Sequence, residues 1–278
     1  MLCDAHIHMG YYSRKGQDTP FYYSPRRIVG IVNRCGVDEF VVSSTCSQVS
    51  EIGIDDIVRE AREMIRLEGQ RAHVFFWLSG HLYDEDRTMV WLQSGLFEGI
   101  KLHEGETPWM MSRQSDLRNI LSRARERDLP VMLHSGENGG CRPLELVKIV
   151  HEYPTVRFNF AHCRPMDEMA MVIADCPNVW TDTAYMALED FPRLCSYDWD
   201  GRLMFGTDLP VWQAHEDVSL TKRYRECVRT FQATGFADSA NHAFCEFIKP
   251  RKDSTFLPSS GEKRRYSIQP GKDKEATR

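Results

Sequence analysis

Between residues 2 and 248, short apolar runs alternate with longer amphipathic stretches. The apolar runs predict strands over 2–8, 38–44, 72–78, 97–103, 130–135, 156–162, 178–183 and 202–207. The amphipathic stretches predict helices over 25–35, 51–69, 84–94, 112–128, 142–153, 165–175, 187–195 and 217–233. Such alternation is typical of βα units and a parallel sheet rather than of hairpins. Eight units in a row predict an α/β fold, a closed (β/α)8 TIM barrel.

A doubly wound open sheet is the competing architecture. It usually carries a glycine-rich phosphate turn after its first strand, where this chain has His8-Met9-Gly10-Tyr11. The length of 278 residues also suits one barrel, since such barrels run to about 250 residues as a single domain. We therefore expect one barrel domain over 1–248 and a C-terminal tail over 249–278.

The tail is rich in Pro, Ser, Gly, Lys and Arg and has no apolar periodicity, which predicts a poorly ordered basic extension. A basic interaction arm around Lys263, Arg264 and Arg265 is the alternative. The whole chain has a net charge of −5 although its tail is basic, so the barrel itself is strongly acidic. That balance argues against a nucleic-acid partner.

The remaining composition narrows the cellular setting. With 42% hydrophobic residues and no run of about 20 apolar positions, the chain predicts a globular protein with no membrane partner. The N-terminus holds a predicted strand in place of a leader peptide, so we expect a cytoplasmic location. Nine cysteines without a C-x-x-C pair indicate neither a disulfide framework nor a zinc ribbon. Barrels commonly form homo-oligomers, but the sequence shows no interface.

Candidate chemistry lies at the ends of the predicted strands. His6 and His8 are one residue apart on the first strand, so their side chains share one side and can reach one metal ion. Catalytic groups of a barrel project from the C-terminal strand ends. The same rim collects Lys101, His103, His134, His162 and Asp208. The other histidines do not follow this rule: His73, His151, His215 and His242 are expected to be structural or exposed, and His81 stays unassigned.

The order His-x-His, Lys, His, His, Asp resembles the amidohydrolase superfamily. The stretches GIKLH, VMLHSGE, FNFAHC and LMFGTDLP are similar to its amidohydrolase-2 branch, which includes aminocarboxymuconate-semialdehyde decarboxylase and related hydrolases. The resemblance covers about 1–248. It implies one divalent ion, held by His6, His8, His134 and Asp208, with His162 helping to activate water.

Metal chemistry agrees with this assignment. Three neutral imidazoles and a carboxylate suit Zn²⁺ and leave room for a water, with Mn²⁺, Fe²⁺ or Ni²⁺ as alternatives. Asp208 can accept a proton from that water, while His162 polarises the substrate carbonyl. In binuclear amidohydrolases the corresponding lysine is carboxylated and bridges two metals. One metal is the preferred reading; two metals with a carboxylated Lys101, near His162 and His103, is the alternative.

Three further residues are candidates for binding the substrate. Arg142 and Arg164 follow the fifth and sixth predicted strands, and Glu137 follows His134 by three positions. Because arginine grips carboxylates in bidentate fashion, a carboxylate-bearing substrate is expected. The preferred function is hydrolysis of a small amide, ester or lactone. The alternatives are non-oxidative decarboxylation of a small unsaturated or aromatic acid, a TatD-like nuclease, which would carry Glu in place of Lys101, and a metal-binding barrel without catalysis.

Overall fold

The computed structural model describes residues 1–12, 21–45, 53–80, 82–103, 109–136, 140–212 and 219–249. The candidate residues His81 and Glu137 lie outside these ranges, as does the expected tail after its first residue. The division of the chain at residue 248 therefore stays a prediction.

One sheet runs through the described part of the chain, in the order β2-β1-β3-β4-β5-β6-β7-β8-β9. Its strands are β1 (Cys3–Tyr12), β2 (Phe21–Tyr23), β3 (Glu39–Ser44), β4 (Ala72–Leu78), β5 (Gly99–Leu102), β6 (Val131–His134), β7 (Phe158–Ala161), β8 (Val179–Asp182) and β9 (Leu203–Met204). All neighbours pair in parallel except β2, which is antiparallel to β1. Strands buried on both faces read as continuous apolar runs, which is why all eight parallel strands were predictable.

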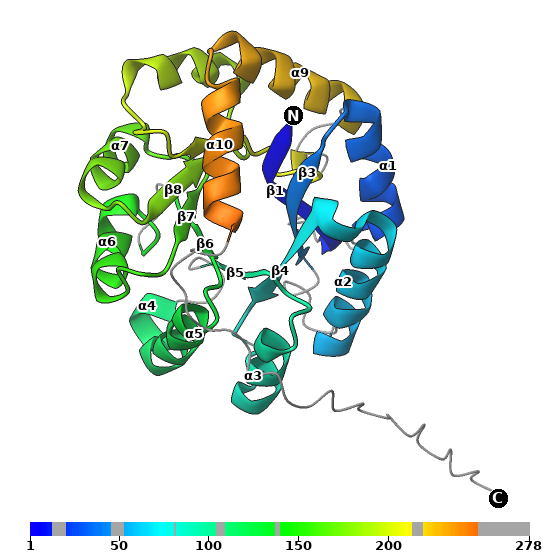
Figure 1. Ribbon diagram of the computed structural model, residues 1–278, viewed down its shortest axis with the longest axis vertical. Coiled ribbons are helices and arrows are strands. Elements are labelled where there is room, and N and C mark those ends of the chain that lie inside the picture. Colours follow the sequence, from blue (N-terminus) through cyan, green and yellow to red (C-terminus); the bar gives the residue numbers. More distant parts are fainter. Residues whose placement is uncertain are drawn as a thin grey trace, which may run out of the picture.

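The sheet curls into a ring and closes between β1 and the segment after β9 (Figure 1). The backbone N–H of Asp208 donates to the carbonyl of His6 at 2.8 Å, and that of His8 donates to the carbonyl of Leu209 at 2.6 Å. The predicted (β/α)8 barrel is thereby confirmed. Closure also has a functional consequence, because the same hydrogen bonds place Asp208 beside the two histidines of β1.

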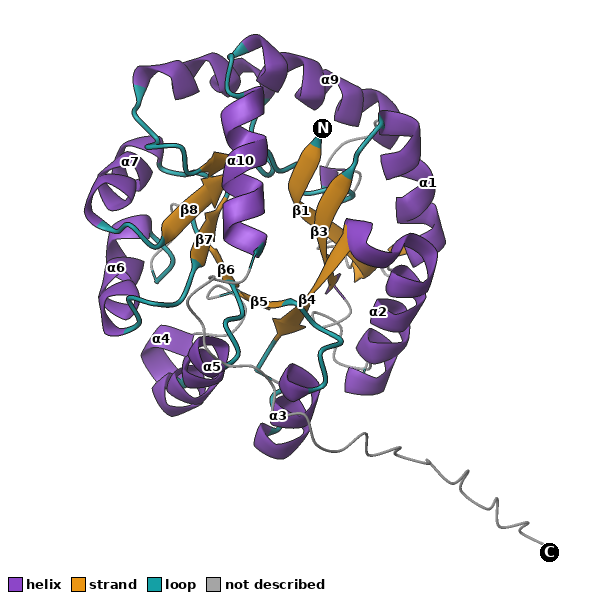
Figure 2. Ribbon diagram, viewed as in Figure 1, coloured by secondary structure: helices purple, strands orange, loops and turns teal. Residues whose placement is uncertain are grey.

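Helices surround the ring of strands (Figure 2). They are α1 (Pro25–Cys35), α2 (Ile54–Glu68), α3 (Glu85–Gln93), α4 (Trp109–Ser112), α5 (Gln114–Glu126), α6 (Pro143–Glu152), α7 (Met166–Asp175), α9 (Leu220–Ala233) and α10 (Ala237–Ile248). The segment predicted as a helix over 187–195 is a 3-10 helix, Leu188–Ser196. It contains Pro192, which lacks the N–H that an α-helix would need at that point. No described helix has both the length and the apolar character needed to cross a membrane.

Among the strands and α-helices described, β2, α4 and α10 were not predicted, and α10 fills the end of the barrel where the strands start. It lies across the ring near β1 (Figure 1). Phe244 and Phe247 of α10 pack against inward side chains near the strand starts, among them Phe75 and Trp180. Burying each phenylalanine stabilises the fold by roughly 1.5–3 kcal/mol. This end of the barrel is therefore a packed core, so the space for chemistry lies at the other end.

Asp4 fixes the junction where the barrel closes. Its carboxylate is fully buried and accepts hydrogen bonds from the Thr207 hydroxyl and the Tyr224 hydroxyl, both at 2.6 Å. It also accepts from the backbone N–H groups of Thr207 at 3.1 Å and His6 at 2.9 Å. These bonds join β1, the segment after β9 and α9. They therefore fix the positions of His6 and of Thr207, the residue before Asp208, relative to each other.

We expect His73, the second residue of β4, to make a pH-dependent contribution to the free energy of unfolding. Its Nδ1 lies 2.7 Å from Glu98 and its Nε2 3.3 Å from Glu39. Burial opposes the charged imidazole, but the two glutamates outweigh it and raise the pKa of His73. The resulting stabilisation should be fully present below about pH 6.5, the pKa of an unfolded histidine, and be lost as pH rises through the raised pKa of the folded state.

Urea unfolding of the wild type and His73→Gln from pH 6 to 9 measures this contribution. The wild type should be more stable than the variant by about 1 kcal/mol or less at pH 6, because both glutamates are partly exposed, and this difference should shrink towards pH 9. His242→Gln is the control, since His242 pairs with Glu246 on the exposed face of α10. A difference for His73→Gln that does not change with pH would contradict the linkage.

Candidate active site

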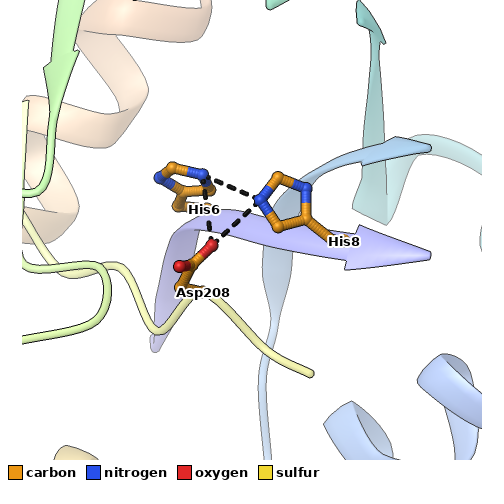
Figure 3. A group of neighbouring side chains, drawn as sticks. All are labelled: His6, His8 and Asp208. Atoms are coloured by element: carbon orange, nitrogen blue, oxygen red, sulfur yellow. Dashed lines mark hydrogen bonds and ion pairs between the residues drawn. The ribbon is translucent and has the colours of Figure 1, made fainter. Parts of the chain in front are cut away.

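The side chains of His6, His8 and Asp208 meet at the end of the barrel opposite α10 (Figure 3). The Nε2 atoms of the two histidines are 3.1 Å apart. Asp208 Oδ1 lies 2.9 Å from His8 Nε2 and 3.5 Å from His6 Nε2. The two imidazoles project from β1 on the same side, and barrel closure brings Asp208 to them. Three ligand atoms from two ends of the chain thus converge on one point.

Hydrogen bonds behind the histidines fix which nitrogen faces that point. His6 Nδ1 lies 3.2 Å from Asp182 Oδ2, and His8 Nδ1 lies 2.9 Å from the Ser43 hydroxyl. A carboxylate can only accept, so the proton of neutral His6 sits on Nδ1 and its Nε2 presents a lone pair. Outer partners of this kind are the usual companions of metal-bound histidines, because they set the tautomer and hold the ring. The donor set fits a divalent metal ion.

The charges of the site suit the same conclusion. Burial lowers the pKa of His8 to about 4. Burial alone would raise the pKa of Asp208, but its hydrogen bond with His8 and the neighbouring imidazole of His6 hold that pKa well below its usual range. At neutral pH His8 therefore offers a neutral imidazole and Asp208 an ionised carboxylate, the protonation states that metal binding requires.

His134 and His162 form a second pair beside these three residues. His162 Nε2 lies 2.9 Å from His134 Nδ1, and His162 Nδ1 lies 3.1 Å from the carbonyl of Ala184. Burial lowers the pKa of both imidazoles well below the usual value. Within the described chain, the tight cluster of ligand atoms contains His6, His8 and Asp208 but not His134. His134 as a fourth ligand stays a prediction.

Lys101 and His103 of the β5 end also face this region. Lys101 is buried, with its Nζ 3.3 Å from His6 Nε2. The ring of His103 stacks on that of His134 with centroids 3.8 Å apart, and burial lowers the pKa of His103 to about 3. Both predicted pocket residues therefore lie in the site.

Several backbone positions at the rim are strained, among them those of His162 and Asp208. His162 has φ of 78° and Asp208 has φ of 59°, a left-handed conformation that costs non-glycine residues about 1–3 kcal/mol. Such strain persists only where surrounding contacts hold it, and it concentrates at functional sites. Here it directs both side chains inward from the ends of their strands.

A cavity of about 160 Å³ lies against these side chains. Its walls include Asp208, His162, Lys101 and Trp77. A neighbouring cavity of about 300 Å³ shares His162, Arg164 and Tyr185 with it. Arg164 thus stands between two spaces, one at the imidazoles and one further out. A substrate occupying both would pass this guanidinium.

Arg164 and Arg142, which the sequence treated alike, differ in their surroundings. Arg164 lies over the ring of Tyr185 and has no hydrogen-bond or ion-pair partner among the residues described. Arg142 is partly exposed, pairs with Glu168 and is not part of either cavity wall. Arg164 is therefore the arginine available to a ligand.

Asp182 is the principal site residue that the sequence did not reveal. It is fully buried at the end of β8 and contacts His6. It accepts hydrogen bonds from Asn159 Nδ2 at 2.6 Å and from the backbone N–H groups of His162 at 3.1 Å and Ala184 at 2.9 Å. These contacts hold its pKa well below the usual range despite burial. The only available signal was an acidic residue closing a predicted strand, at the rim that holds the other candidates.

Cys163, next to His162, has no sign of reactivity. It is completely buried, and burial raises the pKa of its thiol far above the usual value. A thiol that stays protonated is a poor nucleophile and metal ligand. Cys163 therefore packs in the core.

Comparisons with known proteins agree with the fold and with the family that the sequence resembles. The family model described as Amidohydrolase, Amidohydro_2, matches residues 61–230. No curated protein sequence matches the chain.

Several solved structures share the fold. A probable 2-pyrone-4,6-dicarboxylic acid hydrolase from Acinetobacter baumannii with citric acid bound is 14% identical, with coverage of 89% of this chain and 98% of that one and a TM-score of 0.59. A zinc-bound amidohydrolase from Burkholderia multivorans is 11% identical, with coverage of 89% and 99% and a TM-score of 0.62. The 5-carboxyvanillate decarboxylase of Sphingomonas paucimobilis is 10% identical, with coverage of 90% and 99% and a TM-score of 0.56.

At these identities the likeness to the solved structures is one of fold. The family match rests on the sequence itself and spans more than half of the chain, including Lys101, His134, His162 and Asp208. This chain belongs to the amidohydrolase family.

Proposed function

We propose that the protein is a metal-dependent hydrolase of a small carboxylate-bearing amide, ester or lactone, with one Zn²⁺ as its cofactor. The observation that carries the proposal is the convergence of His6 Nε2, His8 Nε2 and Asp208 Oδ1 with the lone pair of His6 fixed by Asp182. Zn²⁺ prefers imidazole and carboxylate ligands in this number. When bound, such an ion lowers the pKa of a coordinated water towards 7 and polarises a substrate oxygen.

Residues of the chain itself would accept the proton of the attacking water and bind and orient the substrate. Asp208 has a second carboxylate oxygen beyond the one that faces the histidines, and that oxygen can accept a proton from the attacking water. His162 holds its proton on Nδ1, against the carbonyl of Ala184, so its Nε2 accepts from His134 Nδ1 and would turn to a partner in the cavity when that contact is replaced. Arg164 would hold a substrate carboxylate through paired N–H groups and so set which bond faces the water.

Whether the site holds one metal ion or two depends on the chemical state of Lys101, unmodified or carboxylated. As an unmodified ammonium group beside His6 it would add positive charge to the pocket, which favours an anionic substrate. As a carbamate it would offer two oxygens between the His6 group and the His134–His162 pair. Metal content per chain, together with the intact mass measured under native conditions, separates these states. The proposed state has one ion at this site and no mass added to Lys101.

Decarboxylation is the second candidate, and the guanidinium of Arg164 beside the ligand cluster, without an ion-pair partner in the part of the chain that the structure describes, also supports it. An enzyme that binds a carboxylate next to a metal can release it as CO₂. A decarboxylase of this fold is known in the relative from Sphingomonas paucimobilis.

The test is a panel of small lactones, amides, esters and unsaturated or aromatic acids, assayed for new carboxylate and for CO₂. The proposed hydrolase should release carboxylate, lose that activity to a chelator and regain it with Zn²⁺. CO₂ release would establish the decarboxylase instead. Full metal content without turnover on any member of the panel would contradict both.

Arg164→Met should raise the KM for carboxylate-bearing substrates. Loss of a charge-assisted hydrogen bond costs roughly 1.5–3 kcal/mol, so we expect an increase of about 10- to 100-fold. Substrates in which the remote carboxylate is replaced by a neutral group should show little change. Steady-state kinetics on the matched pair measures both values.

Arg142→Met is the matched control, since Arg142 pairs with Glu168 outside the cavity walls. It removes the same charge from the same rim and should leave KM within about twofold of the wild type, because surface ion pairs contribute little. If Arg142→Met and Arg164→Met raised KM equally, the carboxylate would not be held by Arg164.

A further inference from the structure

A second group of metal-binding side chains lies far from the proposed active site in the fold. His151 in the last turn of α6 faces Asp175, the last residue of α7, and Cys176, which follows it. Both helices run back towards the starts of the strands that follow them, so this group lies at the end of the barrel opposite to the cavity. α6 and α7 pack side by side there (Figure 1).

The three donor atoms are spaced as one metal ion would require. Cys176 Sγ lies 3.6 Å from His151 Nε2 and 3.9 Å from Asp175 Oδ2, and the latter two atoms are 3.4 Å apart. Tetrahedral zinc has bonds of about 2.3 Å to sulfur and 2.0–2.1 Å to nitrogen or oxygen, which places its ligands about 3.6 Å (S–N), 3.5 Å (S–O) and 3.3 Å (N–O) apart. The S–N and N–O separations match these values within 0.1 Å, whereas the S–O separation of 3.9 Å is about 0.4 Å longer, so a small rotation of the Asp175 side chain would complete the site.

The chemistry of the donors selects the kind of ion. A thiolate, an imidazole and one carboxylate suit Zn²⁺ or Co²⁺ and are a poor set for Mg²⁺ or Ca²⁺, which need several oxygens. The side chains of His151 and Asp175 are 59% and 68% exposed, so water can reach the group and complete the coordination. Cys176 is buried and anchors it.

The immediate charges partly favour binding. Asp175 brings a negative charge, whereas the guanidinium of Arg202 donates to the carbonyl of Cys176. Burial and the carboxylate of Asp175 raise the pKa of the Cys176 thiol. The charge of Arg202 opposes that increase and so favours the thiolate that a metal needs, although the same charge repels a cation. Binding would replace the proton of the Cys176 thiol by the metal, and the proton would pass to solvent.

We propose that His151, Asp175 and Cys176 form a second, structural site for Zn²⁺ or a similar borderline-soft divalent cation. An ion here would join the C-terminal ends of α6 and α7, the two helices that lead into β7 and β8. Those strands carry His162 and Asp182 at their far ends, so the ion would brace the part of the barrel that positions them. The inference does not depend on the proposed catalytic activity.

Titration of the metal-free full chain with Co²⁺ tests this site. The proposed catalytic ligands include no sulfur, so a thiolate-to-cobalt charge-transfer band in the near ultraviolet reports a cysteine site alone. The wild type should show this band, and Cys176→Ser should lose it. Cys195→Ser, which removes an exposed cysteine elsewhere, should retain it.

His151→Ala provides a variant whose folding is not at issue, because the histidine is largely exposed. Loss of an outer partner alone weakens metal binding by about 10- to 100-fold, so loss of a direct ligand should shift the titration midpoint at least as far. Absence of the band in the wild type, or an unchanged band in Cys176→Ser, would overturn the proposal. Either outcome leaves the carboxylate- and CO₂-release assays of the active site unaffected.

Discussion

Asp208→Asn is expected to abolish turnover while leaving the barrel folded. The amide keeps the shape of the carboxylate and the backbone hydrogen bond to His6, so barrel closure should survive. It removes the negative charge that faces His8 at 2.9 Å and the group proposed to accept a proton from water. General acid–base catalysis contributes about 100- to 10,000-fold, and the loss in kcat/KM should reach at least this range.

Two measurements accompany the kinetics of Asp208→Asn. Bound metal should fall, because an amide oxygen is a weaker ligand than a carboxylate, while the circular dichroism spectrum should match that of the wild type. Asp116→Asn is the control, since Asp116 pairs with Arg113 on α5. Full turnover by Asp208→Asn would mean that the rim at the end of β9 is not the reacting site.

Asp182→Ala should reduce both the affinity for metal and the free energy of unfolding. After Asp208→Asn, we expect this substitution to have the largest effect. Without the carboxylate, His6 loses the partner that fixes its tautomer, and outer-partner losses of this kind typically cost about 10- to 100-fold in metal affinity. The substitution also leaves the buried donors of Asn159 and of the His162 and Ala184 backbones without their acceptor. Each unsatisfied donor costs about 1–3 kcal/mol, so the urea midpoint should fall markedly.

Asp182→Asn separates a positioning role from a merely structural one. The amide oxygen can still accept from one or two of these donors, so most of the stability should return. It cannot offer a charged acceptor to His6 Nδ1, so metal affinity should stay low. Competition of the folded variants for zinc with a fluorescent chelator gives this measurement. Recovery of both stability and metal affinity in Asp182→Asn would show that the charge of Asp182 is not needed.

The sequence predicted most of the rim because parallel strands carry a strong signal. β6 and β7 are largely apolar, and His134 closes the first while His162 directly follows the second, so these residues stand out by position. Asp182 ends β8 in the same way but belongs to no spaced motif, and its role follows from contacts with residues about 20 and 176 positions away. Such contacts exist only once the barrel has closed.

α10 escaped prediction for a local reason. Its buried positions have helical spacing, but the residue before the helix, Phe236, offers no capping side chain. The buried residues are Ala240, Ala243, Phe244 and Phe247. Nor does the sequence indicate that a helix crosses the base of the barrel, because that placement depends on the width left between the strands. β2 is equally hard to predict, since three residues paired to one edge of β1 carry no periodicity.

Arg142 and Arg164 show that position in the sequence does not predict the role of residues in the loops that follow the strands. Arg142 and Arg164 each follow a rim strand, and only the loop path decides that one pairs with Glu168 while the other faces the cavities. A strand fixes side-chain direction by its alternation, whereas a loop does not. Roles of residues on the strands can therefore be argued from sequence further than those of residues just beyond them.

Anomalous diffraction at the zinc edge, from crystals grown with Zn²⁺, tests the central claim most directly. The account predicts a peak between His6 Nε2, His8 Nε2 and Asp208 Oδ1, at roughly 2.0–2.2 Å from each. The peak should vanish in Asp208→Asn crystals or weaken strongly. Zinc-soaked wild-type crystals with no peak at these three residues would contradict the account.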